Sequence, residues 1–154
     1  MKKKYKIAIG VAIGLFIIMQ FFQPLKISKD VKSEGDMMKL LNVPAHVAGL
    51  IEKSCYDCHS YNTKWPFYSK ISPMSWIVVY DVETGRKNVN FSIWNEYSTM
   101  IQIAKLRLVC NAIETGNMPL SKYTMIHRDA KLKKEDIDEI CTWVEKQIEI
   151  MKSQ

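Results

Sequence analysis

The chain has 154 residues, which is enough for one modest domain and a short N-terminal extension. With 47% hydrophobic and 25% charged residues, its composition is that of a globular protein, and a largely disordered chain is excluded. The formal charge is +6, but Lys2, Lys3, Lys4 and Lys6 supply four of these charges, and the remaining +2 is too small for a nucleic-acid-binding surface.

Residues 7–22 form a nearly unbroken apolar run, IAIGVAIGLFIIMQFF, directly after the lysines. As a helix this run is about 24 Å long, and with the residues that follow it approaches the thickness of a bilayer core. Basic residues before an apolar segment stay on the cytoplasmic side of the membrane, and the chain after the segment is exported. We therefore expect a transmembrane signal anchor over 1–25, in the inner membrane with the domain on its periplasmic side. The stretch after Phe22 lacks a small-x-small cleavage pattern, so an uncleaved anchor is favoured over a cleaved signal peptide.

A mixed polar segment over 26–43 is expected to be a linker, and residues 44–154 to be the folded domain. Apolar residues at three- and four-residue spacings predict four helical stretches in this domain. These stretches are 44–55, 74–85 with Gly85 as its end, 97–116 with Gly116 as its end, and 135–151. The sequence has no alternation typical of strands, so the fold class is predicted to be all-α.

The most informative motif is the run Cys55-Tyr56-Asp57-Cys58-His59. Its two thiols lie one helical turn apart, a separation that matches the two vinyl groups of haem, and the histidine follows at once as a ligand for iron. This CxxCH pattern predicts that Cys55 and Cys58 attach one haem c covalently and that His59 is the proximal iron ligand.

Two other chemistries also use closely spaced cysteines. A redox-active CxxC dithiol normally begins a helix that follows a strand, and no strand is predicted here. A zinc site needs four ligands, and Cys110 and Cys141 each stand alone on a predicted helix. These two cysteines are expected to be buried free thiols or, in an exported domain, a disulfide between the two long helices.

An electron-carrying haem needs a sixth ligand, and Met118 is the favoured residue. It lies next to Pro119 in a loop between two predicted helices, and a loop can fold over the far face of a porphyrin. The methionine thioether is a soft ligand that raises the reduction potential. His127 is the alternative, since a second imidazole would also complete the coordination and would lower the potential.

Three blocks of sequence are more specific than CxxCH alone. They are CYDCHSYNTKWPFYSKISPMSW, GRKNVNFSIW and GNMPLSKYTMIHRDAKLKKEDIDEICTWV. In these blocks, which span roughly 44–144, the chain resembles the bacterial haem-binding domain family of exported, often membrane-anchored, cytochrome c-like proteins. The resemblance implies a cytochrome c-like helical fold with covalent haem on Cys55 and Cys58, proximal ligation by His59 and distal ligation by Met118.

Aromatic residues are frequent around the motif, and a haem would give them a large apolar surface to pack against. Trp65 is a candidate for a direct haem contact, and Arg86 is a candidate partner for a haem propionate.

Two axial ligands leave the iron no open position. The expected function is therefore electron transfer with redox partner proteins in the membrane or periplasm, rather than catalysis. A haem peroxidase or a gas sensor would instead need an open distal position. A thiol-disulfide or zinc protein without haem would need Cys55 and Cys58 to stay unmodified.

Overall fold

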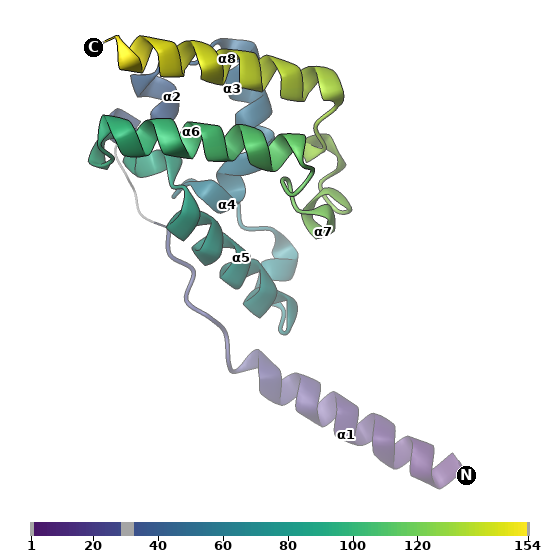
Figure 1. Ribbon diagram of the computed structural model, residues 1–154. Helices are drawn as coiled ribbons and strands as arrows, with labels where there is room; N and C mark the ends of the chain where they lie inside the picture. Colours follow the sequence, from purple (N-terminus) through teal and green to yellow (C-terminus); the bar gives the residue numbers. More distant parts are fainter. Residues whose placement is uncertain (1, 29–32, 154) are drawn as a thin grey trace.

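The computed structural model describes residues 2–28 and 33–153, and every regular element within them is helical, without a strand. Two long helices, α6 (Thr99–Glu114) and α8 (Lys134–Lys152), lie side by side, with α5 (Met74–Asn88) below them and α1 (Lys2–Gln20) standing apart (Figure 1). The shorter helices are α2 (Met37–Leu40), α3 (Ala45–Ile51), α4 (Asp57–His59) and α7 (Ser121–Thr124). The all-α class predicted from the sequence is therefore confirmed.

The core of the domain lies where α6 and α8 pack against each other and where α3 packs on α8. Apolar positions at three- and four-residue spacings turn inward here, as their periodicity predicts. The buried side chains of the two long helices include Leu106, Ile113, Ile140, Val144 and Ile148. Cys110 of α6 and Cys141 of α8 form a disulfide, with their α-carbons 5.4 Å apart. Of the two states expected for these cysteines, the structure therefore has the disulfide.

The CxxCH motif lies at the end of a continuous helical segment. α3 buries Val47, Leu50 and Ile51 in the core and then widens into a π-helical turn over Glu52–Tyr56 before it continues as α4. Such turns are rare in proteins overall, and those that occur are often found at functional sites. Because the segment is anchored in the core at its start, the motif at its end is held in a defined position.

Gly85 does not end α5, which is a correction to the sequence prediction. The helix continues to Asn88, and the N–H of Val89 donates to the carbonyl of Gly85. The glycine is needed for close packing instead, since a Cβ at this position would stand 2.6 Å from the carbonyl oxygen of Cys58. Gly116 does follow the end of α6 as predicted, with a φ of +70°.

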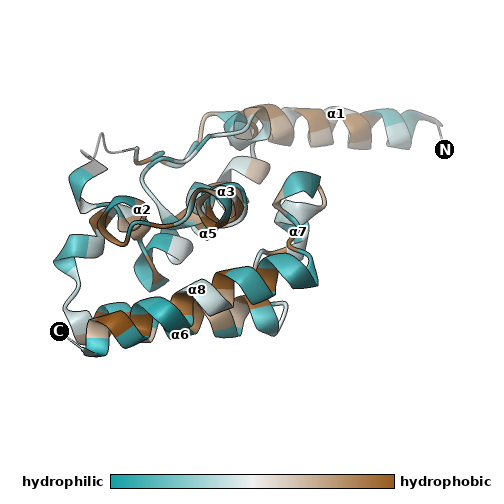
Figure 2. Cartoon of the chain, turned by 90° about the horizontal axis from the view of Figure 1, so that it is seen from above, coloured by the Kyte–Doolittle hydropathy of each residue, from teal (hydrophilic) through white to brown (hydrophobic). Residues whose placement is uncertain are grey.

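The N-terminal helix differs from the expected anchor over 1–25. Within residues 2–28 and 33–153, no helix is both long enough and apolar enough to cross a bilayer. Lys3, Lys4 and Lys6 are part of α1 and the helix ends at Gln20, so its uncharged apolar stretch is roughly 20 Å long. Figure 2 shows this apolar stretch in brown after a hydrophilic start.

The linker expected over 26–43 is also shorter than predicted. Residues 29–32 lie outside the described residues, but α2 belongs to the domain, because Met37 is only 1% exposed and packs in the core. Asp36 caps α2 by accepting a hydrogen bond from the N–H of Met38 at 2.9 Å, and it also accepts one from the buried hydroxyl of Tyr56 at 2.7 Å. The folded domain therefore begins before residue 44.

Candidate functional site

Cys55 and Cys58 are both half-buried and free, since neither takes part in a disulfide. Burial raises the pKa of Cys55 to about 12 and that of Cys58 to about 11, so both thiols stay protonated at neutral pH. A redox-active dithiol has the opposite property, because it needs a thiolate at neutral pH. For a zinc site, moreover, no cluster of three or more His, Cys, Asp or Glu side chains that could hold a metal ion is found among the described residues.

His59 is held as a neutral imidazole with one nitrogen available. Its Nδ1 lies 3.0 Å from the carbonyl oxygen of Val89. A carbonyl oxygen only accepts, so Nδ1 carries the proton and donates, and the lone pair is on Nε2. Burial lowers the pKa of His59, which favours the neutral form. This is the arrangement by which proteins orient a histidine for a metal.

Two neighbouring cavities meet at the motif, with volumes of about 180 Å³ and 190 Å³. Both are lined by Cys55, His59, Asn88 and Met118, so they are two halves of one cleft. The smaller half is apolar and is completed by Val89, Phe91, Leu108, Val109, Ala112 and Ile113. The larger half is more polar, and its lining includes Ser54, Asp57, Asp81, Lys122 and Tyr123. The two halves therefore differ in their lining: one is apolar, and the wall of the other also includes charged and hydroxyl-bearing side chains.

The structure brings Met118 to this cleft and places His127 elsewhere. Met118 follows α6, where its N–H donates to the carbonyl of Ala112 at 3.0 Å, and its side chain lines both halves of the cleft. His127 lines neither half. Its Nε2 lies 2.7 Å from the hydroxyl of Tyr68, and its ring stacks on Tyr123 with centroids 4.3 Å apart. The structure thus brings Met118, and not His127, to the cleft that His59 lines.

Trp65 and Arg86 line neither half of the cleft. The indole N–H of Trp65 donates to Ser28 at 2.9 Å, and the guanidinium of Arg86 donates to the carbonyls of Ser60 and Ile27 at 2.8 and 2.6 Å. Two other tryptophans, Trp94 and Trp143, are buried in the core.

Sequence reasoning missed Phe91, the aromatic ring that does line the apolar half. Its ring lies 6.0 Å from that of His59 and 5.4 Å from that of Tyr56, measured between centroids. Phe91 falls inside the block GRKNVNFSIW, and that block was the available signal.

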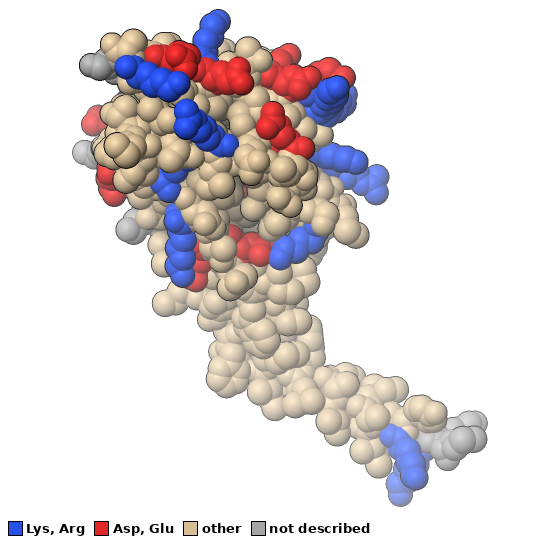
Figure 3. Space-filling model, viewed as in Figure 1, with Lys and Arg blue, Asp and Glu red and all other residues tan. Residues whose placement is uncertain are grey.

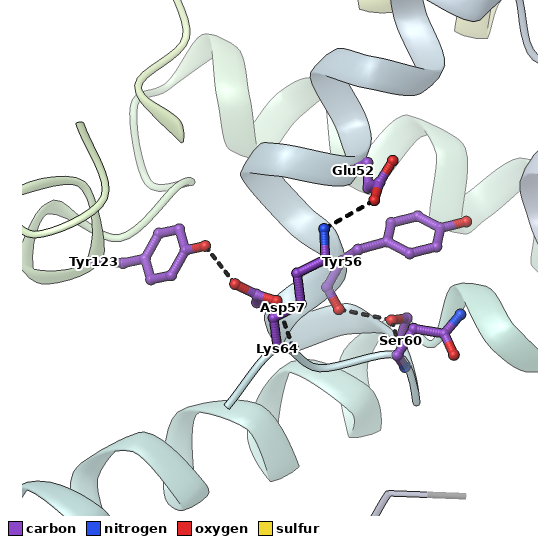
Figure 4. Close-up of polar contacts among 7 residues, drawn as sticks. Glu52, Tyr56, Asp57, Ser60, Lys64 and Tyr123 are labelled. Carbon is purple, nitrogen blue, oxygen red and sulfur yellow. Dashed lines mark hydrogen bonds and ion pairs between the residues drawn. The ribbon is translucent and has the colours of Figure 1, made fainter. Parts of the chain in front are cut away.

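Polar contacts fix the backbone of the motif (Figure 4). The carboxylate of Asp57 accepts from the hydroxyl of Tyr123 at 2.8 Å and from the N–H of Lys64 at 2.9 Å. The hydroxyl of Ser60 donates to the carbonyl of Tyr56 at 2.7 Å. These hydrogen bonds connect the motif to α7 and to the loop that follows the motif.

Comparison with known proteins agrees with this site. The family described as "Haem-binding domain" matches residues 14–146, which is most of the chain. The chain belongs to this haem-binding domain family. Over 104 residues it is also 27% identical to the cytochrome c peroxidase Ccp of Escherichia coli (strain K12), a match that covers 64% of this chain and 22% of that protein. The match thus spans about a fifth of the length of that relative. No solved structure matches it.

The cleft of this haem-binding domain fits the group that its family binds. Its apolar half suits a porphyrin ring, and two unpaired thiols, an available imidazole nitrogen and a thioether lie on its wall. Ser54 adds a buried hydroxyl without a hydrogen-bond partner on the polar side. Haem is therefore the cofactor for which these residues are suited.

Proposed function

We propose that this haem-binding domain carries one covalently attached haem c and transfers single electrons. The observation that carries the proposal is that Cys55, Cys58, His59 and Met118 all line one apolar cleft. A metal-binding thiol pair would need further ligands nearby, and a redox dithiol would need a lowered pKa. A haem attached through two thioethers and held by two iron ligands would use all four side chains.

Each of these residues has a defined role in the proposal. Cys55 and Cys58 would form thioether bonds to the vinyl groups, Nε2 of His59 would bind the iron, and the sulfur of Met118 would bind it from the other side. A bound haem supplies a one-electron iron couple. With His59 and Met118 both holding the iron, no position would be left for a substrate, and the haem would serve one-electron transfer.

We also propose that the domain works on the periplasmic side of the inner membrane, with α1 as its attachment and redox proteins of membrane or periplasm as partners. Lysines are followed in α1 by apolar side chains that no other element covers, which suits contact with lipid. The disulfide between Cys110 and Cys141 suits an oxidising compartment, where haem c is also attached.

A haem peroxidase is the second candidate, and the similarity to a cytochrome c peroxidase favours it. This activity requires an open distal position with a base and a cation beside it. His127 is engaged with Tyr68, and Arg86 donates to backbone carbonyls away from the cleft. A gas sensor would need the same open position. Because Met118 lines the cleft, electron transfer is the better supported function.

The test is to produce the full chain in a bacterium that has haem-attachment machinery. Haem staining after denaturing electrophoresis should follow the polypeptide, and the spectra should show low-spin bands in both oxidation states. The double variant Cys55→Ala, Cys58→Ala should lose the stain. As the matched control, Cys110→Ser, Cys141→Ser should keep it. A wild-type chain without stain would contradict the proposal. A redox-active dithiol or a zinc site would then again be the alternatives.

A further inference from the structure

An uncharged, exposed apolar surface surrounds the start of α5. It consists of six residues, which we name the apolar collar: Phe67, Ile71, Met74, Trp76, Ile77 and Tyr80. Phe67 and Tyr80 are the most exposed, at 77% and 68%. Scattered exposed apolar residues need no explanation, but a contiguous group with three aromatic rings indicates a contact surface.

The collar is continuous with the end of α1. Ser72 lies between collar residues and exchanges two hydrogen bonds with the side chain of Gln20, at 3.0 and 3.1 Å. The indole of Trp76 donates to the carbonyl of Phe22 at 2.6 Å. The exposed side chains of Phe21, Phe22 and Leu25 extend the same surface. In Figure 3 this neck of the molecule is free of charged residues on the face shown.

The hydrogen bonds also fix the direction in which the N-terminal segment leaves the domain. Trp65 binds Ser28 at 2.9 Å, and Arg86 binds the carbonyl of Ile27 at 2.6 Å. Together with the contacts of Gln20 and Phe22, these bonds hold the segment from the end of α1 to Ser28 along the domain. A lipid layer that receives α1 would therefore lie next to the collar.

Polarity changes sharply along the exposed face of α5. Trp76, Ile77 and Tyr80 are exposed in its first half, whereas Glu83 and Lys87 are exposed in its second half. Aromatic residues at such a boundary are typical of the region between lipid chains and water.

Two lysines lie at the edge of the collar. Burial and the nearby charge of Lys70 lower the pKa of Lys26, and its ammonium lies 5.7 Å from the ring centroid of Trp65. Cations at the edge of an exposed apolar surface complement the anionic headgroups of a bacterial membrane. The positive charges of Lys26 and Lys70 at the edge of the collar thus indicate that the collar fits an anionic membrane surface.

We infer that the apolar collar lies in the interfacial layer of an anionic phospholipid bilayer, so that the domain is seated directly on the membrane. The inference rests on the proposed attachment through α1. It also orients the cofactor cleft. A small cavity of about 70 Å³ is lined by Met74 and Ile77 of the collar and by Cys58 and Tyr123, which also line the polar half of the cleft. The polar half of the cleft then faces the membrane side of the domain.

Photo-crosslinking in lipid vesicles tests this directly. The full chain is prepared with p-benzoylphenylalanine in place of Phe16, Tyr80 or Ile150, and each form is reconstituted into vesicles of phosphatidylcholine and phosphatidylglycerol. Phe16 reports on α1 and Tyr80 on the collar. Ile150 is the control, since it is 48% exposed, similar to the 45% of Phe16, but belongs to α8, which lies on the side of the domain away from α1 (Figure 1). Lipid adducts are then measured by mass spectrometry.

We expect adducts at positions 16 and 80 in similar yield, and about tenfold less at 150, because the interfacial layer that a bound surface enters is only ~5–10 Å deep. Adducts at 16 without adducts at 80 would overturn the seated collar while leaving the attachment by α1 intact. Adducts at 80 alone would support the collar and remove α1 as the attachment. Their absence at both positions would overturn both proposals.

A charge variant provides a second readout. Lys26→Glu, Lys70→Glu should lower the adduct yield at position 80 several-fold in vesicles that contain phosphatidylglycerol and leave the yield at position 16 unchanged. Equal yields at position 80 for wild type and this variant would contradict the role of the anionic headgroups.

Discussion

Gly85 lies against the carbonyl oxygen of Cys58, and a Cβ on this glycine would stand 2.6 Å from that oxygen. The contact joins the last turn of α5 to the second cysteine of the motif. Asn88, one turn later on α5, lines the cleft, and the adjoining Val89 both lines it and accepts the hydrogen bond from His59. Because Gly85 has no side chain, α5 can lie close to the motif, and this contact sets the distance between α5 and the segment that carries Cys58.

Replacing Gly85→Ala should destabilise the protein by about 1–3 kcal/mol, because backbone atoms rather than a flexible side chain must move. The matched control is Gly49→Ala in α3, where a Cβ meets nothing within 4 Å and alanine should stabilise the helix by up to about 1 kcal/mol. Urea unfolding of both variants gives the two free energies. Equal effects of the two substitutions would show that the contact with Cys58 is unimportant.

Replacing Met118→Ala should leave the haem covalently attached but remove one axial ligand. The ferrous protein should then bind carbon monoxide, and its reduction potential should fall, since the thioether raises it. Carbon monoxide difference spectra and a redox titration measure the two effects. His127→Ala is the control and should behave as wild type, because His127 is engaged with Tyr68. If His127→Ala admits carbon monoxide and Met118→Ala does not, the two assignments must be exchanged.

Removing the disulfide with Cys110→Ser, Cys141→Ser should lower the free energy of unfolding by about 3–4 kcal/mol, the value for two cysteines 31 positions apart. The haem spectrum of the folded variant should not change, since neither cysteine lines the two halves of the cleft. Denaturant unfolding followed at the haem band measures both quantities. A variant as stable as the wild type would mean that these cysteines are not joined in the protein.

Replacing Tyr56→Phe should loosen α2 from the domain, because the buried hydroxyl of Tyr56 donates to Asp36. We expect a loss of about 1–2 kcal/mol and faster amide exchange over 36–41. Tyr80→Phe is the control, since this hydroxyl lies on an exposed side chain and its removal should change stability by less than about 0.5 kcal/mol. Unchanged exchange over 36–41 in Tyr56→Phe would contradict the role of this hydrogen bond.

The long helices were predictable because their apolar residues repeat with the period of the helix over four or more turns. α6 and α8 lie within two residues of their expected bounds at each end. α2 was not predictable, since it is a single turn in a polar segment and Met37 is its one buried residue. The local sequence predicts Gly85 as the end of a helix, whereas its role depends on its contact with Cys58, 27 positions away in the chain.

The motif residues of the candidate site are adjacent in sequence, so a local pattern was enough to find Cys55, Cys58 and His59. The loop position of Met118 agrees with its place on the cleft. The apolar wall was less accessible, because Val89 and Phe91 become neighbours of His59 only when α5 folds back on the motif. Trp65 was a reasonable candidate from its nearness in sequence, but its ring packs with the N-terminal segment instead.

Hydrogen bonds join the segment over residues 20–28 to the domain, and they have a consequence for how this domain would exchange electrons. A carrier on a long tether can swing from donor to acceptor, and the length of the tether sets how often it meets each of them. Here the segment after α1 lies along the domain, so the cofactor would stay at one height and one orientation above the lipid. Under the proposed function, such a domain would work as a fixed relay, and its two partners would have to diffuse to it within the plane of the membrane or from the solution above.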